Sequence, residues 1–276
     1  MTSRKPLLLS FDVEEFDLPL KWGRALPRSR QLDTTEAGVE RLLPVLARHA
    51  EPATFFVTGT LVRDRPQLVA ALAAAGHEIG VHGFDHQDDY RSLPAAEAIQ
   101  RLRAARALVQ DASGQPVDGV RTPYLLPCPA DRLRAAGFRY DASIHPTWVF
   151  GRYNNLRSSR RPWRQCGLLH LPISVVPFVR WPVSFLWYRT AGARLGRRLA
   201  HLAAVGAPYL HLYFHPWEAI DIPPLGAPRW VAVRTGAAFV VALDDLLVWS
   251  VPRYRCMTLG TFARGCAAPD LDQEGP

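Results

Sequence analysis

The stretch KPLLLSFDVEEFD, residues 5–17, is the first part of the chain that indicates a fold. Its apolar part, Leu7 to Phe11, has the length and composition of a buried strand. Asp12 closes that strand, and Glu14 follows two residues later. An apolar strand that runs directly into carboxylates is typical of an α/β domain with a functional site at the carboxyl ends of its strands.

Downstream of this stretch, short apolar runs alternate with helical stretches. The sequence Asp33-Thr-Thr-Glu36 resembles a capping box and predicts the start of a helix that runs to His49. The other elements expected in the first half are strands at 53–57, 78–81 and 119–121 and helices at 66–75, 94–111 and 129–136. Such alternation predicts a parallel sheet, either open or closed into a barrel.

The second half is less regular. Its expected elements are a long loop at 144–164, an aromatic stretch broken by proline at 176–188, strands at 168–173, 209–214 and 254–259, and helices at 189–205 and 235–250. We find no domain linker, so we expect a single domain over 1–266 with insertions at about 144–165 and 174–190. The tail at 267–276 is expected to be loose.

Composition limits the class of protein. The chain has 276 residues, 48% of them hydrophobic, which suits one large α/β domain. Its four cysteines form no regular framework and indicate a reducing compartment. No apolar run reaches the roughly 18 to 20 residues of a membrane-spanning helix. The apolar run near the N-terminus is short and lacks a cleavage site, so we expect a cytoplasmic location.

The net charge of +8 is unevenly distributed. No acidic residue occurs between Asp141 and Glu218. The arginines in that span are Arg152, Arg157, Arg160, Arg161, Arg164, Arg180, Arg189, Arg194, Arg197 and Arg198. Such a span attracts anions, although an arginine-rich codon usage produces the same bias.

Polar side chains follow several of the predicted strands. They are Asp12 and Glu14 after the first strand, His82 and His86 after the third, Arg121 at the end of the fourth, and His215 after the strand at 209–214. Because the carboxyl ends of parallel strands meet at one edge of a sheet or barrel, we expect these side chains to lie close together.

These residue types suit a metal-dependent hydrolase. Two imidazoles and one carboxylate bind Zn²⁺ or a similar ion and leave positions open for water and a substrate oxygen. A second carboxylate can accept the proton of that water, and a histidine across the site can protonate a leaving amine. The spacing of His82 and His86 in HGFDH is weak support by itself. It is not the zincin motif, since Gly83 stands where that motif has glutamate.

Six short motifs together resemble the polysaccharide deacetylases, the NodB-homology group of carbohydrate esterases. In order along the chain they are FDVEE, TFFVTG (54–59), GHEIGVHGFDH, RTPY, GFRYDASI (137–144) and LYFHP. The resemblance covers roughly residues 7–216. It implies a distorted (β/α)7 barrel, here with an aromatic and arginine-rich insertion, and metal-dependent removal of an N-acyl group, by family default acetyl, from an amino sugar.

The resemblance also implies roles for individual residues. These are Asp12 as catalytic base, His82 and His86 as metal ligands, Arg121 as the partner of the base, Tyr124 as the source of a backbone N–H for the oxyanion, and His215 as general acid. Asp141 lies in the motif whose aspartate orients that histidine, and Trp148 matches a tryptophan of the substrate groove. Trp217, two residues after His215, is expected to form a wall of the site.

The first motif departs from the family pattern. The common form is Thr-Phe-Asp-Asp, in which the second aspartate binds the metal, but Val13 occupies that position here. We expect Glu14 to be the carboxylate ligand, with Glu15 or Asp17 as alternatives and Asp12 itself as a less favoured one. A metal-free member of the family is a further alternative, although the presence of both His82 and His86 argues against it. The metal is expected to be zinc, with cobalt, nickel or manganese as alternatives.

The arginine-rich span suggests the substrate. It carries many aromatic side chains as well, and aromatic faces suit sugar rings whereas arginine binds phosphate. We therefore expect the substrate to be an N-acylated amino sugar or glycan attached to a lipid diphosphate or a nucleotide. We also expect the protein to make peripheral contact with the inner face of an anionic membrane.

Three other functions are weighed against this one. A deformylase or an allantoinase-like C–N hydrolase would use the same fold, and a non-catalytic sugar- or phospholipid-binding module would contain no metal. Nucleic-acid binding is not expected, because no motif that reads a nucleic-acid groove is present and the strand-end carboxylates would repel phosphate in the absence of a metal.

Overall fold

The computed structural model describes residues 4–266, so the predicted tail at 267–276 lies outside the described residues. The strands of the main sheet are β1 (Lys5–Val13), β2 (Thr54–Val57), β3 (Glu78–Val81), β4 (Gly119–Val120), β5 (Tyr140–Asp141), β8 (Trp163–Gln165), β9 (Leu168–His170), β10 (Leu210–Phe214) and β11 (Tyr254–Met257). Their order is β10-β1-β2-β3-β4-β5-β9-β8, and all neighbours pair in parallel except β8 and β9.

The sheet curls until its two sides approach each other. Just beyond β9, the backbone N–H of Ser174 donates to the carbonyl of His211 in β10, at 3.0 Å. The N–H of His211 donates in turn to the hydroxyl of Ser174, at 2.9 Å. These bonds join the β9 side of the sheet to β10, which confirms the predicted distorted barrel of the NodB type.

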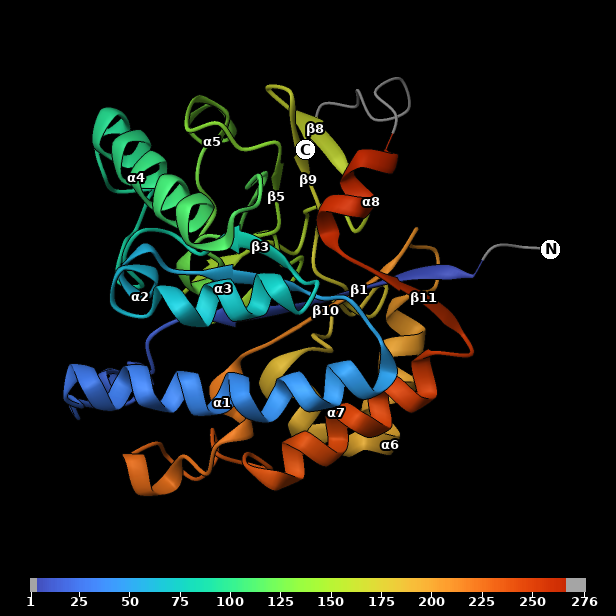
Figure 1. The fold of residues 1–276 in the computed structure, drawn as a ribbon. Coiled ribbons are helices and arrows are strands. Elements are labelled where there is room, and N and C mark those ends of the chain that lie inside the picture. Colours follow the sequence, from blue (N-terminus) through green and yellow to red (C-terminus); the bar gives the residue numbers. More distant parts are fainter. Residues whose placement is uncertain (1–3, 267–276) are drawn as a thin grey trace.

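Strand β1 runs through the middle of the molecule (Figure 1). Along one edge it pairs with β10. Its other edge is shared by two strands, since β11 pairs with Lys5–Leu8 and β2 pairs with Ser10–Val13. Side chains of β1 alternate between the helix layer and the barrel interior, as the two-residue period of a strand requires. Leu8 packs inside the barrel and Phe11 packs in the main core, where its ring stacks on that of Phe55.

Helices surround this sheet. They are α1 (Arg28–His49), α2 (Gly59–Asp64), α3 (Pro66–Ala74), α4 (Ala95–Ser113), α5 (Ala130–Ala135), α6 (Phe185–Ala203), α7 (Ala237–Ser250) and α8 (Leu259–Gly265), with short 3₁₀ turns η1 (Leu18–Trp22), η2 (Pro123–Leu125), η3 (Pro216–Ala219) and η4 (Pro223–Leu225). Helices α1, α6 and α7 lie on one side of β1, and α4 and α5 lie on the other (Figure 1). None of the helices within residues 4–266 has the length and apolar character needed to cross a membrane.

The predicted start of the first helix is wrong. Helix α1 begins at Arg28, directly after Pro27, whose φ of −53° and ψ of 143° place it outside the helix. Asp33 and Glu36 therefore lie inside the helix, and both carboxylates bind the guanidinium of Arg65 at 3.0 Å instead of capping. Two short helices, α2 and α8, were not predicted; each follows a threonine whose hydroxyl accepts a backbone N–H as an N-cap does.

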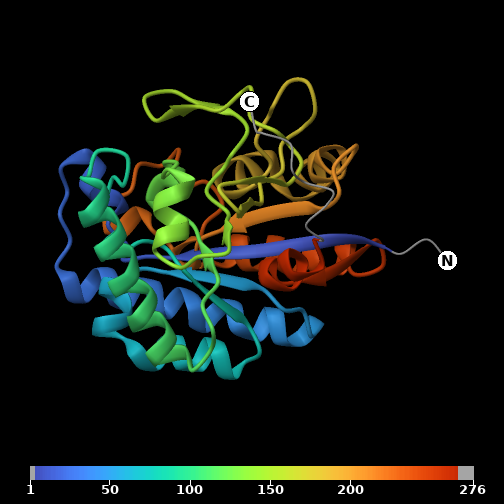
Figure 2. The same ribbon diagram turned by 90° about the horizontal axis from the view of Figure 1, so that it is seen from above.

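The long loop expected at 144–164 contains secondary structure. Strands β6 (Trp148–Val149) and β7 (Tyr153–Asn154) pair as a small antiparallel hairpin, and β8 begins at Trp163. Figure 2 shows the β6–β7 hairpin extending away from the body of the molecule. Helix α6 starts at Phe185, earlier than predicted, and is kinked at Gly192, where φ is 76°.

Candidate active site

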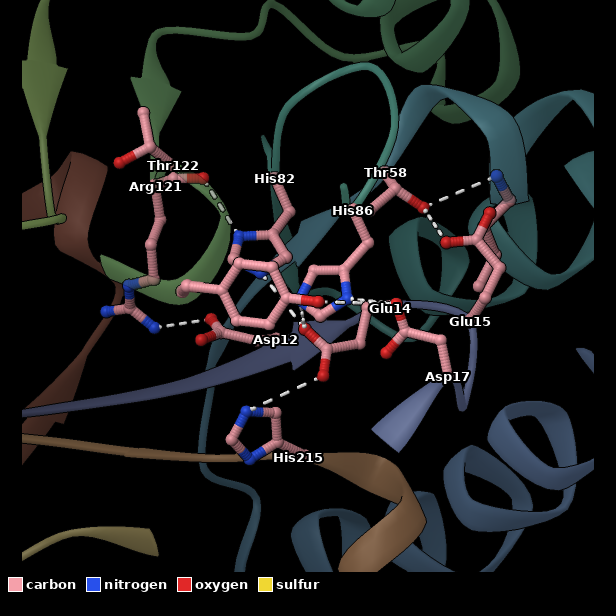
Figure 3. Close-up of polar contacts among 12 residues, drawn as sticks. Asp12, Glu14, Glu15, Asp17, Thr58, His82, His86, Arg121, Thr122 and His215 are labelled. Carbon is pink, nitrogen blue, oxygen red and sulfur yellow. Dashed lines mark hydrogen bonds and ion pairs between the residues drawn. The ribbon is translucent and has the colours of Figure 1, made fainter. Parts of the chain in front are cut away.

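The site lies where several strands of the barrel end, as Figure 3 shows. Asp12 belongs to the end of β1, His82 follows β3, Arg121 follows β4, and His215 follows β10. All four side chains are buried. The structure therefore brings together side chains that are far apart in the sequence, as their positions at strand ends predict.

Glu14, His82 and His86 form a group suited to binding a metal ion. One ligand atom from each lies within 4.8 Å of the others, and all three side chains are buried. Glu14 Oε2 lies 3.1 Å from His82 Nε2 and 2.8 Å from His86 Nε2. Two imidazoles and a carboxylate are a donor set that suits Zn²⁺ and similar ions.

Both imidazoles are held with Nε2 toward Glu14. The Nδ1–H of His82 donates to the backbone carbonyl of Arg121 at 2.9 Å, and the Nδ1–H of His86 donates to Asp17 Oδ2 at 2.8 Å. Histidines that bind metals commonly donate their other N–H to a carbonyl or a carboxylate in this way. The residues present therefore fit a divalent ion.

The two histidines are joined by a loop and not by a helix. Gly83 has a φ of 79°, and a Cβ there would lie 2.9 Å from the ring of Pro123. The hydroxyl of Tyr90 accepts the N–H of Phe84 at 2.7 Å, which supports the turn. Glycine is thus required at the position where a zincin motif has glutamate.

The charged side chains of this group shift one another's pKa values. Burial acts to raise the pKa of Glu14, but the charges of His86 and His215 and hydrogen bonds from both loop histidines hold it well below its ordinary value. Burial acts to lower the pKa of His86, but Glu14 and Asp17 raise it to about 10. Carboxylates thus outweigh burial at this histidine, and a bound divalent ion would displace its proton.

The alternative carboxylates have other partners. Glu15 accepts hydrogen bonds from Thr58 at 2.9 Å and Thr60 at 2.5 Å and pairs with Arg28 at 2.8 Å; Figure 3 shows it beside Thr58. Asp17 contacts His86 through the other ring nitrogen. Glu14 and Glu15 both follow the last residue of β1, Val13, and their carboxylates have different partners: Glu14 contacts the two imidazoles and Glu15 contacts the two threonines.

Asp12 is held by Arg121. The guanidinium is completely buried, and its Nη1 lies 2.6 Å from Asp12 Oδ1. The same side chain donates to Ser10 Oγ at 3.0 Å, to the carbonyl of Ala142 at 3.0 Å and to His211 Nε2 at 2.9 Å. These contacts orient the Asp12 carboxylate, and no described residue makes a hydrogen bond to its other oxygen, Oδ2.

His215 is oriented by Glu218. Both the backbone N–H and the Nδ1–H of His215 donate to Glu218 Oε1, at 2.8 and 3.3 Å. Glu218 is completely buried and is paired with the buried guanidinium of Arg189. The ring of His215 stacks on Trp217, with centroids 4.8 Å apart, and its Nε2 lies 3.9 Å from Glu14 Oε1. The acidic residue three positions after the histidine is the feature of the sequence that would have identified Glu218.

The role that the resemblance implied for Asp141 is wrong in this chain. Asp141 Oδ2 accepts the Nδ1–H of His170 at 2.9 Å, and Oδ1 accepts the backbone N–H of Ser143 at 2.9 Å. The imidazole of His170 stacks on Trp163, which keeps Asp141 engaged at the wall of the barrel. Asp141 therefore does not contact His215.

A cleft of about 350 Å³ opens above these residues. Its walls include Tyr124, Trp217 and His145, together with residues of η1 and of the β6–β7 hairpin. Burial and the charge of Arg121 lower the pKa of His145 to about 3, so its imidazole is neutral. Trp217 forms a wall of the cleft, as expected. Trp148 does not line the cleft; its side chain is 57% exposed and packs against Phe150, which does line it.

Tyr124 has an unusual backbone conformation. Its φ is 56° and its ψ is 12°, in the left-handed region. Its ring lies 4.3 Å from that of His86, so the residue borders the metal-binding group from the Arg121 side. This placement is compatible with the predicted contribution of its backbone N–H, which stays a prediction.

Comparison with known proteins agrees with this geometry. The sequence profile of the family described as "Polysaccharide deacetylase" matches residues 2–139, half of the chain. This chain belongs to the polysaccharide deacetylase family. The matched half contains the Asp12–Glu14 motif, the histidine loop and Arg121, whereas His215 and Glu218 lie beyond it.

Among relatives of this family member, a chitooligosaccharide deacetylase of Bradyrhizobium sp. (strain ANU 289) is 43% identical over 67 residues, which are 24% of this chain and 31% of the relative. A peptidoglycan deacetylase of Helicobacter pylori is 29% identical over 118 residues, 42% of this chain and 40% of the relative. The matched regions thus span less than half the length of these relatives.

Solved structures share the fold. A Mycobacterium smegmatis protein assigned to the polysaccharide deacetylases superposes with a TM-score of 0.68 at 20% identity, over 98% of this chain and 97% of that one. An allantoinase superposes with a TM-score of 0.64 at 18% identity, over 95% of this chain and 90% of that one. At these identities, the similarity supports the architecture alone.

Proposed function

We propose that this polysaccharide deacetylase family member is a metal-dependent hydrolase that removes the N-acetyl group of an amino sugar. The observation that carries the proposal is the convergence of Glu14, His82 and His86 with Asp12 on one side and His215 on the other. Relatives described as chitooligosaccharide and peptidoglycan deacetylases support the choice of an N-acetylated amino sugar.

In this proposal each residue has a defined task. A divalent ion bound by Glu14, His82 and His86 would supply Lewis acidity toward the acyl carbonyl and lower the pKa of water. Asp12, oriented by Arg121 through Oδ1, accepts the proton of the attacking water at Oδ2. His215 donates a proton from Nε2 to the leaving amine, because Glu218 holds its Nδ1–H.

Zinc is the ion that we propose, because two imidazoles and one carboxylate with open positions are typical of catalytic zinc. Cobalt, nickel and manganese accept similar ligands, and affinity alone does not decide between them in a cell. The three proposed ligands therefore suit several ions, and elemental analysis would identify the one that binds.

Metal content tests the site directly. Elemental analysis of the wild type after reconstitution with zinc should give about one ion per chain. Glu14→Ala and His82→Ala should lose it, whereas the matched control Glu15→Ala should keep it because Glu15 faces Thr58 and Thr60. Loss in Glu15→Ala with retention in Glu14→Ala would move the carboxylate ligand and overturn this assignment.

Acyl-group release tests the reaction. Acetate release from N-acetylglucosamine oligomers by the zinc-loaded enzyme is the expected result. Release of formate from N-formyl sugars, or hydrolysis of allantoin, without acetate release would favour the other C–N hydrolases of this fold. Binding of sugar without hydrolysis of any of these compounds would favour a binding module.

A further inference from the structure

Two cationic side chains converge at the mouth of the cleft. Lys21 comes from η1 and Arg152 from the turn of the β6–β7 hairpin, and both line the cleft. Lys21 Nζ lies 4.2 Å from the centroid of the Tyr124 ring, and the guanidinium carbon of Arg152 lies 5.3 Å from the same centroid. Segments more than 100 positions apart in the sequence thus place two positive charges around one aromatic ring.

Neither cation has an acidic partner. Within residues 4–266, no carboxylate lies within 4.0 Å of Lys21 or Arg152, and both side chains reach the solvent at the mouth of the cleft. Burial in the cleft and the nearby charge of Arg152 lower the pKa of Lys21 to about 8, although the carboxylates of Glu14 and Asp17 act to raise it. Two like charges held close together destabilise each other. An anion between them would remove that repulsion.

Further aromatic side chains line the same cleft. They belong to three pairs of rings, namely Trp22 with Trp230 (ring centroids 6.0 Å apart), Trp148 with Phe150 (6.2 Å) and Trp181 with Trp187 (5.1 Å). At least one ring of each pair lines the cleft, and Phe150 is 88% exposed. Large aromatic groups exposed around a polar cleft mark a surface that binds a partner or a ligand.

We propose that Lys21 and Arg152 form a subsite for a phosphate group attached to the amino sugar, and that the aromatic pairs bind the group beyond that phosphate. This proposal rests on the proposed N-deacetylation and names its substrate class. It assigns phosphate-linked amino sugars, in which the phosphate carries either a nucleoside or a lipid chain.

The lining of the cleft supports this class of substrate. Asp12, the metal-binding group, Lys21 and Arg152 all line it, and the ring of Tyr124 contacts His86 and both cations. A phosphate-linked amino sugar has an acyl amide for the metal-binding group, a phosphate for the cations and a carrier for the aromatic side chains. A neutral glycan has no charge to offset the two cations.

Three N-acetylglucosamine probes test the subsite by acetate release. They are neutral N,N′-diacetylchitobiose, uridine diphosphate N-acetylglucosamine and farnesyl diphosphate N-acetylglucosamine. We expect kcat/KM to be at least about tenfold higher for one of the phosphate-linked probes than for the neutral probe. A preference for the uridine probe assigns a nucleoside to the aromatic pairs, and a preference for the farnesyl probe assigns a lipid chain. An equal or higher kcat/KM for the neutral probe overturns the proposal.

Charge-removing variants test the two residues. Lys21→Gln and Arg152→Gln should each raise KM for the preferred phosphate-linked probe by about tenfold, with no change for the neutral probe. Arg157→Gln is the matched control, since Arg157 is exposed just after the same hairpin and does not line the cleft. Equal losses on both kinds of probe, or the same loss in the control, overturn the proposal.

Binding separates failure of the subsite from failure of the reaction. If the wild type releases no acetate from any probe, the proposed deacetylation is wrong, and tryptophan fluorescence then measures the binding of uridine diphosphate and of farnesyl diphosphate. Binding that is weaker in Lys21→Gln and Arg152→Gln, but not in Arg157→Gln, supports the subsite. Absence of binding to the wild type overturns it.

Discussion

The floor of the candidate site differs in burial from the β6–β7 hairpin and the segment 178–181. At the floor, Asp12, Glu14 and Arg121 are buried and held by hydrogen bonds and ion pairs to residues at the strand ends of the barrel. On the hairpin and in the segment 178–181, Phe150 and Phe178 are 88% and 97% exposed. The floor is suited to hold one geometry, whereas the hairpin and the segment 178–181 leave large side chains open to solvent.

The strongest test of the floor is Asp12→Asn. The amide keeps the shape of the side chain but cannot accept the proton of water, so kcat should fall by about 10²- to 10⁴-fold. Steady-state acetate release measures this, with zinc content and melting temperature as checks that the site and fold persist. Activity within tenfold of the wild type would show that another group is the base.

Glu218→Gln tests whether the floor extends to the residues behind His215. The substitution leaves the buried charge of Arg189 without its partner, so we expect a loss of about 3 to 5 kcal/mol in the free energy of unfolding. It should also lower kcat by about tenfold with KM unchanged, since His215 is less well oriented. Denaturant unfolding and kinetics measure the two effects. An unchanged kcat in folded protein would limit Glu218 to a structural role.

Substitution of one glycine in the barrel and one on the hairpin compares how tightly the two regions are packed. A Cβ at Gly119 would overlap the ring of Tyr140, so Gly119→Ala should destabilise the protein by about 1 to 3 kcal/mol through overpacking. A Cβ at Gly151, on the hairpin, would meet nothing within 4 Å, and the φ of this residue is 73°, so Gly151→Ala should cost only about 1 kcal/mol through backbone strain. Urea unfolding of both variants measures the difference, and equal losses would contradict it.

The smallest effect on the folded enzyme is expected at Phe178. This side chain is almost entirely exposed and is followed by Val179 and Arg180, so Phe178→Ser should change the free energy of unfolding by no more than about 0.5 kcal/mol. If the predicted contact with anionic membranes occurs through this segment, the variant should bind less to vesicles rich in phosphatidylglycerol. Cosedimentation measures this, and unchanged vesicle binding would remove Phe178 from that role.

Residues at strand ends could be predicted from the sequence, but side-chain partners beyond them could not. Asp12, His82 and Arg121 follow apolar runs, so their convergence depends only on the parallel sheet. The preference for Glu14 over Glu15 rests on the family resemblance alone, because both residues lie beyond the end of β1 at Val13 and no periodic pattern decides between them. The orienting partner of His215 depends on the direction of a single 3₁₀ turn, and this is why Glu218 was missed and Asp141 was assigned that role.

Local patterns failed where tertiary contacts intervened. Asp33 and Glu36 have the spacing of a capping box, but Arg65, between α2 and α3, binds both carboxylates, and α1 starts earlier, directly after Pro27. The β6–β7 hairpin has only two residues in each strand and no hydrophobic alternation, so no periodic pattern marks it. The cleft wall that these residues form was therefore not predictable from periodicity.

The divided edge of β1 has a consequence for how the protein folds. Leu7 pairs with Leu210, 203 positions later, and Lys5 pairs with Tyr254, 249 positions later. A central strand with partners so distant in sequence forms a domain of high contact order, which folds slowly. During synthesis, this apolar strand lacks β10 and β11 until most of the chain has been made, and it is exposed to aggregation for that time. The strand that holds Asp12 therefore gains its full set of neighbours late in synthesis.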